Sequence, residues 1–202
     1  MSNNPDSLHY GIVLYNYQAK KSKIVVFDSN LGKIQCIVFK LDLVLKLHPG
    51  SYISYNISKK NFYYSLSEID ILAFPDYWVK NNFLFFHHAL ELCYYFLPLD
   101  CPAHPVFNLI KILYYSPETV NTNYLKKLFL CQFFSKLDMY PCEETIKNKN
   151  ILDLLKISLD NKINFDVNLD MELNHWLLSC INLYSGSYSF KTINFLKELS
   201  IS

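Results

Sequence analysis

The spacing of apolar residues changes in the middle of the chain, and this change constrains the fold more than any other feature. From residue 11 to about residue 72, apolar and polar residues alternate, and β-branched and aromatic side chains are frequent. From residue 83 onward, apolar residues recur every three or four positions. The first spacing is typical of strands and the second of amphipathic helices. We therefore predict an α+β protein with its strands first and its helices second.

The first part contains five strand-like segments separated by turn residues. Gly32, which can adopt a positive φ, favours a turn after the second segment, and Pro49 with Gly50 favours a turn before the fourth. Short strands in this number favour a small closed barrel, because closure leaves no exposed strand edge. An OB-like five-stranded β-barrel is our first choice and an SH3-like barrel the second. The predicted strands cover residues 11–17, 23–28, 33–40, 51–58 and 62–66.

The second part contains six helix-like segments, several of them bounded by proline. Apolar residues surround nearly the whole circumference of segment 124–137, which predicts that this helix is buried. We expect a C-terminal all-helical bundle domain over residues 79–202. It follows an OB-fold nucleic-acid-binding domain over residues 1–78, with a short linker near residues 75–80. The predicted helices cover residues 83–97, 105–115, 124–137, 151–159, 172–183 and 189–199.

The sequence carries no pattern typical of secretion or membrane insertion. Asn3, Asn4 and Asp6 stand where a signal peptide needs a basic start and an apolar run. The most apolar stretch, residues 83–99, is too short and too polar to span a membrane. The six cysteines lie in apolar segments without a C-x-x-C pair, which is typical of reduced thiols. We expect a cytoplasmic protein without disulfides or a membrane partner.

Several potential metal ligands lie close together in the sequence. Cys101 and His104 have ligand-like spacing, and His87, His88 and Cys93 precede them. Zinc sites normally use two close pairs, whereas His87 and His88 point to different helix faces and Cys93 has no partner three residues on. Ordinary core or surface side chains therefore explain these residues better, and we expect no metal or other cofactor.

Motifs of catalysis are missing. The sequence contains no G-x-S-x-G, H-E-x-x-H, Walker or G-x-G-x-x-G pattern, and four glycines leave little material for a phosphate-binding loop. Glu143 and Glu144 fit the first turn of a helix or an exposed corner better than an acid–base pair. We predict that the protein is not an enzyme.

Positive charge is concentrated in the predicted barrel, although the whole chain has a net charge of only +1. Residues 20–60 contain eight lysines against Asp28 and Asp42. In an OB-like barrel the loops that carry these lysines flank the binding face, where tyrosines can stack on bases. Solvated turn lysines and core tyrosines are the alternative interpretation. The tyrosines available for stacking are Tyr15, Tyr17, Tyr52 and Tyr55.

The order and spacing of these segments resemble the RecO family of bacterial recombination mediators along about residues 9–200. Each motif alone is weakly specific, and the resemblance lies in their succession. It runs from the first hairpin with its glycine–lysine turn, through successive helices and a proline corner, to a closing helix after a glycine turn. The motifs are residues 11–14, 20–28, 31–34, 49–50, 66–70, 86–92, 96–98, 105–109, 125–130, 137–141 and 186–199.

The chain departs from the family pattern in three respects. Its corner has Asp138 and Met139 where members often have leucine and glycine. Many members carry a four-cysteine zinc motif after the corner that Pro141 would occupy, whereas only Cys142 is present here. Basic residues in the family are largely arginine, but all 19 basic residues of this chain are lysine. Lysine keeps the attraction to phosphate and loses the bidentate geometry of the guanidinium group.

The resemblance implies a non-catalytic DNA repair and recombination mediator. Such a protein binds single- and double-stranded DNA, anneals complementary strands, engages the acidic tail of single-stranded DNA-binding protein and works with a RecR-type partner to load RecA. It would be cytoplasmic and associated with the nucleoid. The expected DNA-binding residues are Lys20, Lys21, Lys23, Lys33, Lys40, Lys59, Lys60, Tyr15 and Tyr17. The expected rims of the tail pocket are Lys126, Lys127 and Lys191.

Three other functions stay open at this point. A barrel-plus-bundle adaptor could bind proteins only, and its basic segment would then be incidental. An OB-type surface could instead bind single-stranded RNA, because the sequence does not reveal which sugar it prefers. A metal-dependent enzyme using Cys101 and His104 is the least favoured of the three.

Overall fold

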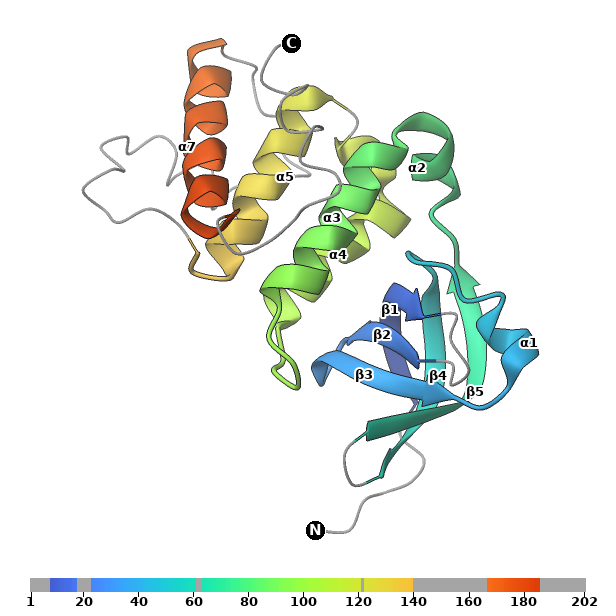
Figure 1. Cartoon of the computed structure of the whole chain (residues 1–202). Helices are drawn as coiled ribbons and strands as arrows, with labels where there is room; N and C mark the ends of the chain where they lie inside the picture. Colours follow the sequence, from blue (N-terminus) through green and yellow to red (C-terminus); the bar gives the residue numbers. More distant parts are fainter. Residues whose placement is uncertain (1–7, 18–22, 61–62, 121, 140–166, 186–202) are drawn as a thin grey trace. The chain divides into compact units, whose positions relative to one another are not determined.

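The computed structural model of the 202-residue chain describes residues 8–17, 23–60, 63–120, 122–139 and 167–185. The chain divides into two compact units, Met1–Phe107 and Asn108–Ser202. The first unit contains all five strands and continues through two helices, whereas the sequence suggests a boundary between residues 78 and 79. Figure 1 gives the order of the elements along the chain.

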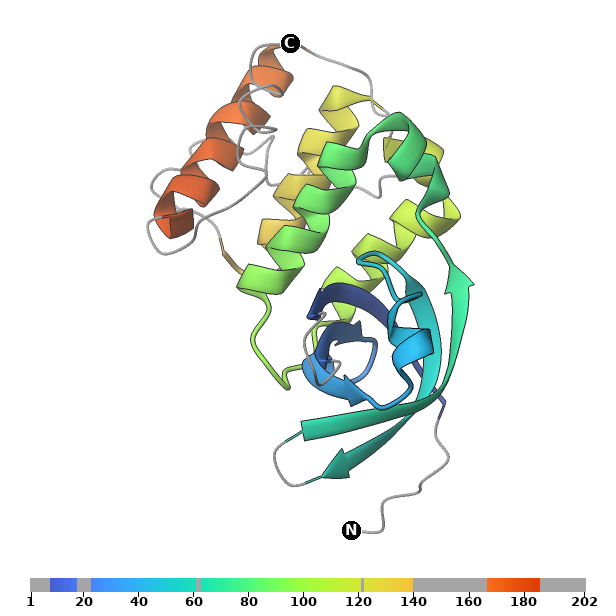
Figure 2. The same ribbon diagram turned by 45° about the vertical axis from the view of Figure 1, so that its right-hand side comes forward.

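The five strands form a closed barrel in the order β1-β2-β3-β5-β4 (Figures 1 and 2). The first three strands make an antiparallel meander, β3 pairs in parallel with β5, and β4 pairs antiparallel with both β5 and β1. The predicted five-stranded barrel is confirmed, and its form is OB-like. The strands are β1 (His9–Tyr17), β2 (Lys23–Asp28), β3 (Gly32–Val38), β4 (Tyr52–Lys60) and β5 (Tyr63–Ala73).

Strand β5 is more than twice as long as the sequence predicts. Its pairing with β4 shifts register between Ser54 and Asn56, and Glu68 in this region has a positive φ of 50°. A register shift of this kind changes which residues face inward, so the regular alternation is lost beyond it. The predicted end at Leu66 is therefore wrong, and the strand continues to Ala73.

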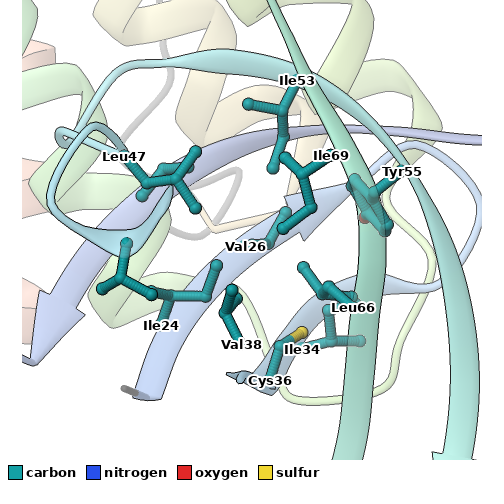
Figure 3. Close-up of a cluster of buried hydrophobic side chains, with 12 residues drawn as sticks. Ile24, Val26, Ile34, Cys36, Val38, Leu47, Ile53, Tyr55, Leu66 and Ile69 are labelled. Carbon is teal, nitrogen blue, oxygen red and sulfur yellow. The ribbon is translucent and has the colours of Figure 1, made fainter. Parts of the chain in front are cut away.

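The barrel interior is filled by apolar side chains from all five strands and from the segment around the short helix α1 (Leu41–Val44), as Figure 3 shows. Asn16 on β1 holds this segment, because its side-chain amide donates to the carbonyl oxygens of Val44 and Leu47, both at 2.9 Å. The buried cluster consists of Val13, Ile24, Val26, Ile34, Cys36, Val38, Val44, Leu47, Ile53, Tyr55, Leu66 and Ile69.

A buried carboxylate joins three strands of the barrel. Oδ2 of Asp28 on β2 lies 2.9 Å from Nδ1 of His9 on β1 and accepts a hydrogen bond from the Tyr55 hydroxyl on β4. Its other oxygen accepts from the backbone N–H groups of Asn30 and Leu31 at 2.7 and 2.8 Å. The same side chain therefore links strands and shapes the turn into β3.

Two helices follow the barrel in the first unit, α2 (Asp76–Asn81) and α3 (Phe83–Phe96). The expected linker near residues 75–80 is wrong, because these residues form α2, a helix too short to show a period in the sequence. Asn82 separates the two helices, and its side-chain oxygen accepts from the Phe85 N–H at 3.2 Å as an N-cap. Trp78 packs on Phe85, with ring centroids 5.1 Å apart.

The remaining predicted helices are also present where they are described, although the last of them begins at Val167 and not at residue 172. Helix α4 (His104–Tyr115) starts with Pro105 in its first turn. In the second unit lie a short 3-10 turn (Pro117–Val120), α5 (Asn123–Lys136) and α7 (Val167–Ser185). Buried residues surround α5, as its sequence predicts. The predicted helices at 151–159 and 189–199 lie outside the described residues.

Within the second unit α5 and α7 touch, and the Cys131 thiol lies 3.9 Å from the Leu173 carbonyl oxygen. Among the helices of the described ranges, none combines the length and the apolar character needed to cross a membrane.

Candidate nucleic-acid interface

Tyrosines gather at the end of β1 and on α3. Tyr15 and Tyr17 are each 39% exposed, and their ring centroids lie 4.5 Å apart at an interplanar angle of 59°. The Tyr94 ring on α3 lies 5.6 Å from the Tyr15 ring, and the Tyr94 and Tyr17 hydroxyl groups share a hydrogen bond of 2.8 Å. We call Tyr15, Tyr17 and Tyr94 the tyrosine cluster. Its rings are partly exposed and held in place, as base stacking requires.

Lys23 places a positive charge beside this cluster. It opens β2, pairs with Tyr17 across the β1–β2 ladder and is exposed. The hydrogen bond to Tyr94 is the main reason why the pKa of Tyr17 is raised, and the positive charge of Lys23 acts in the opposite direction. Tyr17 thus remains a neutral ring near an exposed ammonium group.

Lys33 is placed differently from the other candidate lysines. Its ammonium group donates to the Tyr94 carbonyl oxygen at 2.6 Å and lies 5.6 Å from the centroid of the Tyr94 ring. The side chain is half-buried, and this burial lowers the pKa of Lys33. A lysine in this position already has a partner for its charge within the unit.

Two exposed lysines at the end of β4 lie over aromatic rings. The Lys59 ammonium is 5.2 Å from the Tyr64 ring centroid, and the Lys60 ammonium is 5.7 Å from that of Phe39. Phe39 itself is 67% exposed, and Lys40, also exposed, follows it in the chain. Contacts of this kind hold the lysine stems while their charges stay in water. We call these five residues the hairpin group.

Tyr64 is the most enclosed member of the hairpin group. Burial is the largest cause of its raised pKa, while the hydrogen bond from Lys59 acts in the opposite direction. A hydrogen bond to the Asp100 carboxylate also raises this pKa. The Tyr64 hydroxyl therefore lies between a cation and an anion.

Strand β3 runs between the two groups. The ladder joins Lys23 of β2 to Ile37 of β3, and Ile37 to Ser65 of β5. Lysines and aromatic side chains thus occur on both sides of β3. This strand lies in the barrel wall between the tyrosine cluster and the hairpin group. This arrangement suits a strand of nucleic acid that crosses β2 and β3, the face that OB-type barrels commonly use.

Several expected residues lie elsewhere. Tyr52 and Tyr55 are buried, so the hypothesis that they stack on bases is wrong. A pocket rim needs an exposed ammonium group, whereas Lys126 and Lys127 on α5 are both buried, and burial lowers the pKa of Lys126. The remaining expected residues, Lys20, Lys21 and Lys191, lie outside the described residues.

The residues considered as metal ligands form no three-ligand group in the described part of the chain. Within the described ranges, no group of three or more histidine, cysteine or carboxylate side chains is placed to hold a metal ion. Cys93 and His88 are buried in α3, and burial lowers the pKa of His88 to about 4. Cys101 is exposed, whereas Cys36, Cys93, Cys131 and Cys180 are buried.

Sequence reasoning missed three aromatic residues of the two groups: Phe39, Tyr64 and Tyr94. Tyr64 is the second residue of β5 and lies opposite Lys59 in the β4–β5 ladder, so this contact follows once the register of the hairpin is known. Phe39 follows β3, outside the β4–β5 hairpin, so the register of that hairpin does not predict its contact with Lys60. Tyr94 lies 77 residues after Tyr17, and no local signal joins them.

No protein-family model matches the chain, and no curated protein matches its sequence. A function must therefore be argued from the residues and their geometry.

Proposed function

We propose that the barrel binds single- and double-stranded DNA and that the protein acts without catalysis as a DNA repair and recombination mediator that anneals complementary strands. The observation that carries this proposal is the pairing of exposed lysines with held aromatic rings on an OB-like barrel. Tyr15 and Tyr17 lie beside Lys23, and Lys59 and Lys60 lie over rings of their own.

Strand annealing needs no bond-making residue. Lysines neutralise the phosphates of two strands and so allow them to approach, and aromatic rings hold bases unstacked and available for pairing. Because every lysine acts as a point charge, affinity should depend steeply on salt and weakly on base sequence.

The finer parts of the proposal follow the family resemblance. They are an OB fold for residues 1–78, a helical bundle for residues 79–202, and a cytoplasmic, nucleoid-associated location. A RecR-type partner, the tail of single-stranded DNA-binding protein and the loading of the recombinase belong to the same proposal. Lys191 is the residue proposed at the rim of the pocket that binds this tail.

The test is fluorescence anisotropy of a labelled single-stranded oligonucleotide at about 50 to 200 mM salt. Wild type is compared with the double variant Lys59→Gln/Lys60→Gln. The matched control, Lys46→Gln/Lys80→Gln, removes the same charge from two exposed lysines outside both groups. We expect the hairpin variant to reduce the salt slope by about 1.4, since each phosphate contact to a single strand contributes roughly 0.7. The control should keep the wild-type slope.

Two results would overturn the proposal. Background affinity of the wild type at about 50 mM salt would leave a protein-binding adaptor as the better function. An equal reduction of affinity and salt slope in the hairpin variant and in its control would mean that only the net charge of the protein matters. An RNA oligonucleotide of the same sequence, measured in parallel, decides between DNA and RNA, and a strand-pairing assay with complementary oligonucleotides tests annealing itself.

A further inference from the structure

The carbonyl oxygen of Tyr94 lacks its usual helical partner. In an α-helix this oxygen would accept from the N–H of the residue four positions later, which here is Pro98, and proline has no N–H. Helix α3 ends at Phe96, with Leu97 extended after it. The Tyr94 carbonyl is therefore one of the acceptors at a helix C-terminus that a group outside the helix must satisfy.

Lys33 supplies this partner from the barrel. Its ammonium group donates to the Tyr94 carbonyl at 2.6 Å, and α3 has no basic residue in its own last turn. A cation at this end is favourable because the helix dipole places partial negative charge there. Lys33 thus completes the end of α3.

The backbone of Lys33 is joined to the segment after α3 as well. Its carbonyl accepts from the Asp100 N–H at 2.9 Å, and Lys33 and Leu99 form a parallel bridge. Gly32 beside it lies so close to the Cys101 backbone that no Cβ would fit. The end of α3 is consequently fixed on β3 by both the main chain and the side chain of Lys33.

Tyr94 transmits this placement to the exposed tyrosines. Its hydroxyl shares a 2.8 Å hydrogen bond with the Tyr17 hydroxyl, and its ring lies 5.6 Å from the Tyr15 ring. A shift of Tyr94 would remove the hydrogen bond and change the support of both rings. Lys33 is therefore linked to the tyrosine cluster through Tyr94, although its own ammonium group donates to the end of a helix.

We propose that Lys33 is a positioning residue for the tyrosine cluster, acting through Tyr94, and not a phosphate ligand. The inference rests on the proposed nucleic-acid function, because the cluster is its stacking surface. It assigns Lys33 a role different from that of Lys23, which is exposed on the neighbouring strand.

The salt dependence of oligonucleotide binding separates the two roles. We compare Lys33→Met with Lys23→Met, a matched loss of one lysine. Lys23→Met should lower the salt slope by about 0.7, as expected for one lost phosphate contact. Lys33→Met should weaken binding roughly fivefold or more at every salt concentration and leave the salt slope unchanged. A fivefold loss is the lower end of the range expected when one stacking contact is lost. A slope reduced by Lys33→Met as much as by Lys23→Met would overturn the proposal.

A double-mutant cycle adds a second criterion. If Lys33 acts through the cluster, Lys33→Met should cost little further affinity in a Tyr17→Ala background. Losses that simply multiply would show that Lys33 contacts the ligand independently. Tyr94→Phe keeps the carbonyl bond to Lys33 and removes only the hydroxyl bond to Tyr17, so it should weaken binding without unfolding the helix end.

A measurement without nucleic acid keeps this inference distinct from the proposed function. In protein labelled with 3-fluorotyrosine, Lys33→Met should shift the fluorine resonances of Tyr17 and Tyr94, whereas Lys80→Met should leave them in place. Unmoved resonances in Lys33→Met would overturn the positioning role even if the oligonucleotide binds. Shifted resonances in a protein that binds no oligonucleotide would keep the structural link and reject the nucleic-acid function.

Discussion

The Tyr55 hydroxyl donates to Oδ2 of Asp28 at 2.5 Å, and neither side chain is reached by solvent. Asp28 is a buried carboxylate whose neighbours are His9, Tyr55 and two backbone N–H groups of the following turn. Burial and the carboxylate both raise the pKa of Tyr55, so the hydroxyl stays protonated and able to donate. The bond ties β4 to β2, two strands that are not neighbours in the barrel.

Tyr55→Phe should lower the free energy of unfolding by about 1–3 kcal/mol, because it leaves a buried carboxylate oxygen with one donor fewer. Urea denaturation followed by circular dichroism measures the loss. The control is Tyr10→Phe, which removes a hydroxyl from an exposed tyrosine of β1. Equal stability of the two variants would contradict the structural importance of the bond.

Stability should fall in mild acid because of His88. Burial lowers its pKa from 6.5 to about 4, so the unfolded chain takes up a proton at a higher pH than the folded chain does. The free energy of unfolding should therefore decrease by about 3 kcal/mol between pH 6.5 and pH 4, with no further loss from this group below pH 4.

Replacing His88 by leucine removes the part of the pH dependence of stability that this histidine causes. Urea denaturation of His88→Leu at a series of pH values should show a flatter curve than wild type between pH 6.5 and pH 4. The control His48→Gln, at an exposed histidine, should retain the wild-type curve. An unchanged pH dependence in His88→Leu would show that other groups cause the acid sensitivity.

Gly32→Ala should destabilise the first unit by at least about 2 kcal/mol. The residue has a φ of 80°, which costs an L-residue roughly 1–2 kcal/mol, and its Cβ would overlap the Cys101 carbonyl. Thermal unfolding measures the effect, with Asn30→Ala in the same turn as control. A melting temperature close to that of wild type would mean that the backbone near Cys101 moves away at little cost.

Cys101 should be the first of the five described cysteines to react with iodoacetamide. It is exposed, whereas burial raises the pKa of Cys36, Cys93 and Cys131 and so reduces the fraction of each thiol that is ionised at neutral pH. Peptide mapping by mass spectrometry follows each site in time. Alkylation of Cys36 or Cys93 at the rate of Cys101 would show that the barrel or α3 opens readily.

Local pattern was enough to predict the barrel and the main helices. Alternation, together with β-branched residues in the buried strand β2, located the strands, and alternation placed Tyr55 on the same face as Ile53, which correctly indicates burial. The interpretation of Tyr55 as a stacking residue is wrong because it ignored that shared face. A hydroxyl on a core face needs a buried partner, and Asp28 is that partner.

The candidate site could be predicted only in part. Lysines in loops and strand ends mark the basic surface, and Lys23, Lys40, Lys59 and Lys60 are exposed as expected. The role of Lys33 depends on a helix that begins 50 residues later, so its sequence neighbours carry no sign of it. Pro98 was a detectable clue, since a proline after a helix leaves a carbonyl that needs another donor.

The position of β5 between β3 and β4 has a consequence for synthesis of the chain. In the interval between the emergence of Val38 and that of Ala73 from the ribosome, the last strand of the β1–β3 meander has a bare edge. At ordinary elongation rates this interval lasts roughly 2 to 7 seconds. The nascent chain is therefore most prone to pair with a neighbouring copy during this interval, and emergence of β5 ends the exposure.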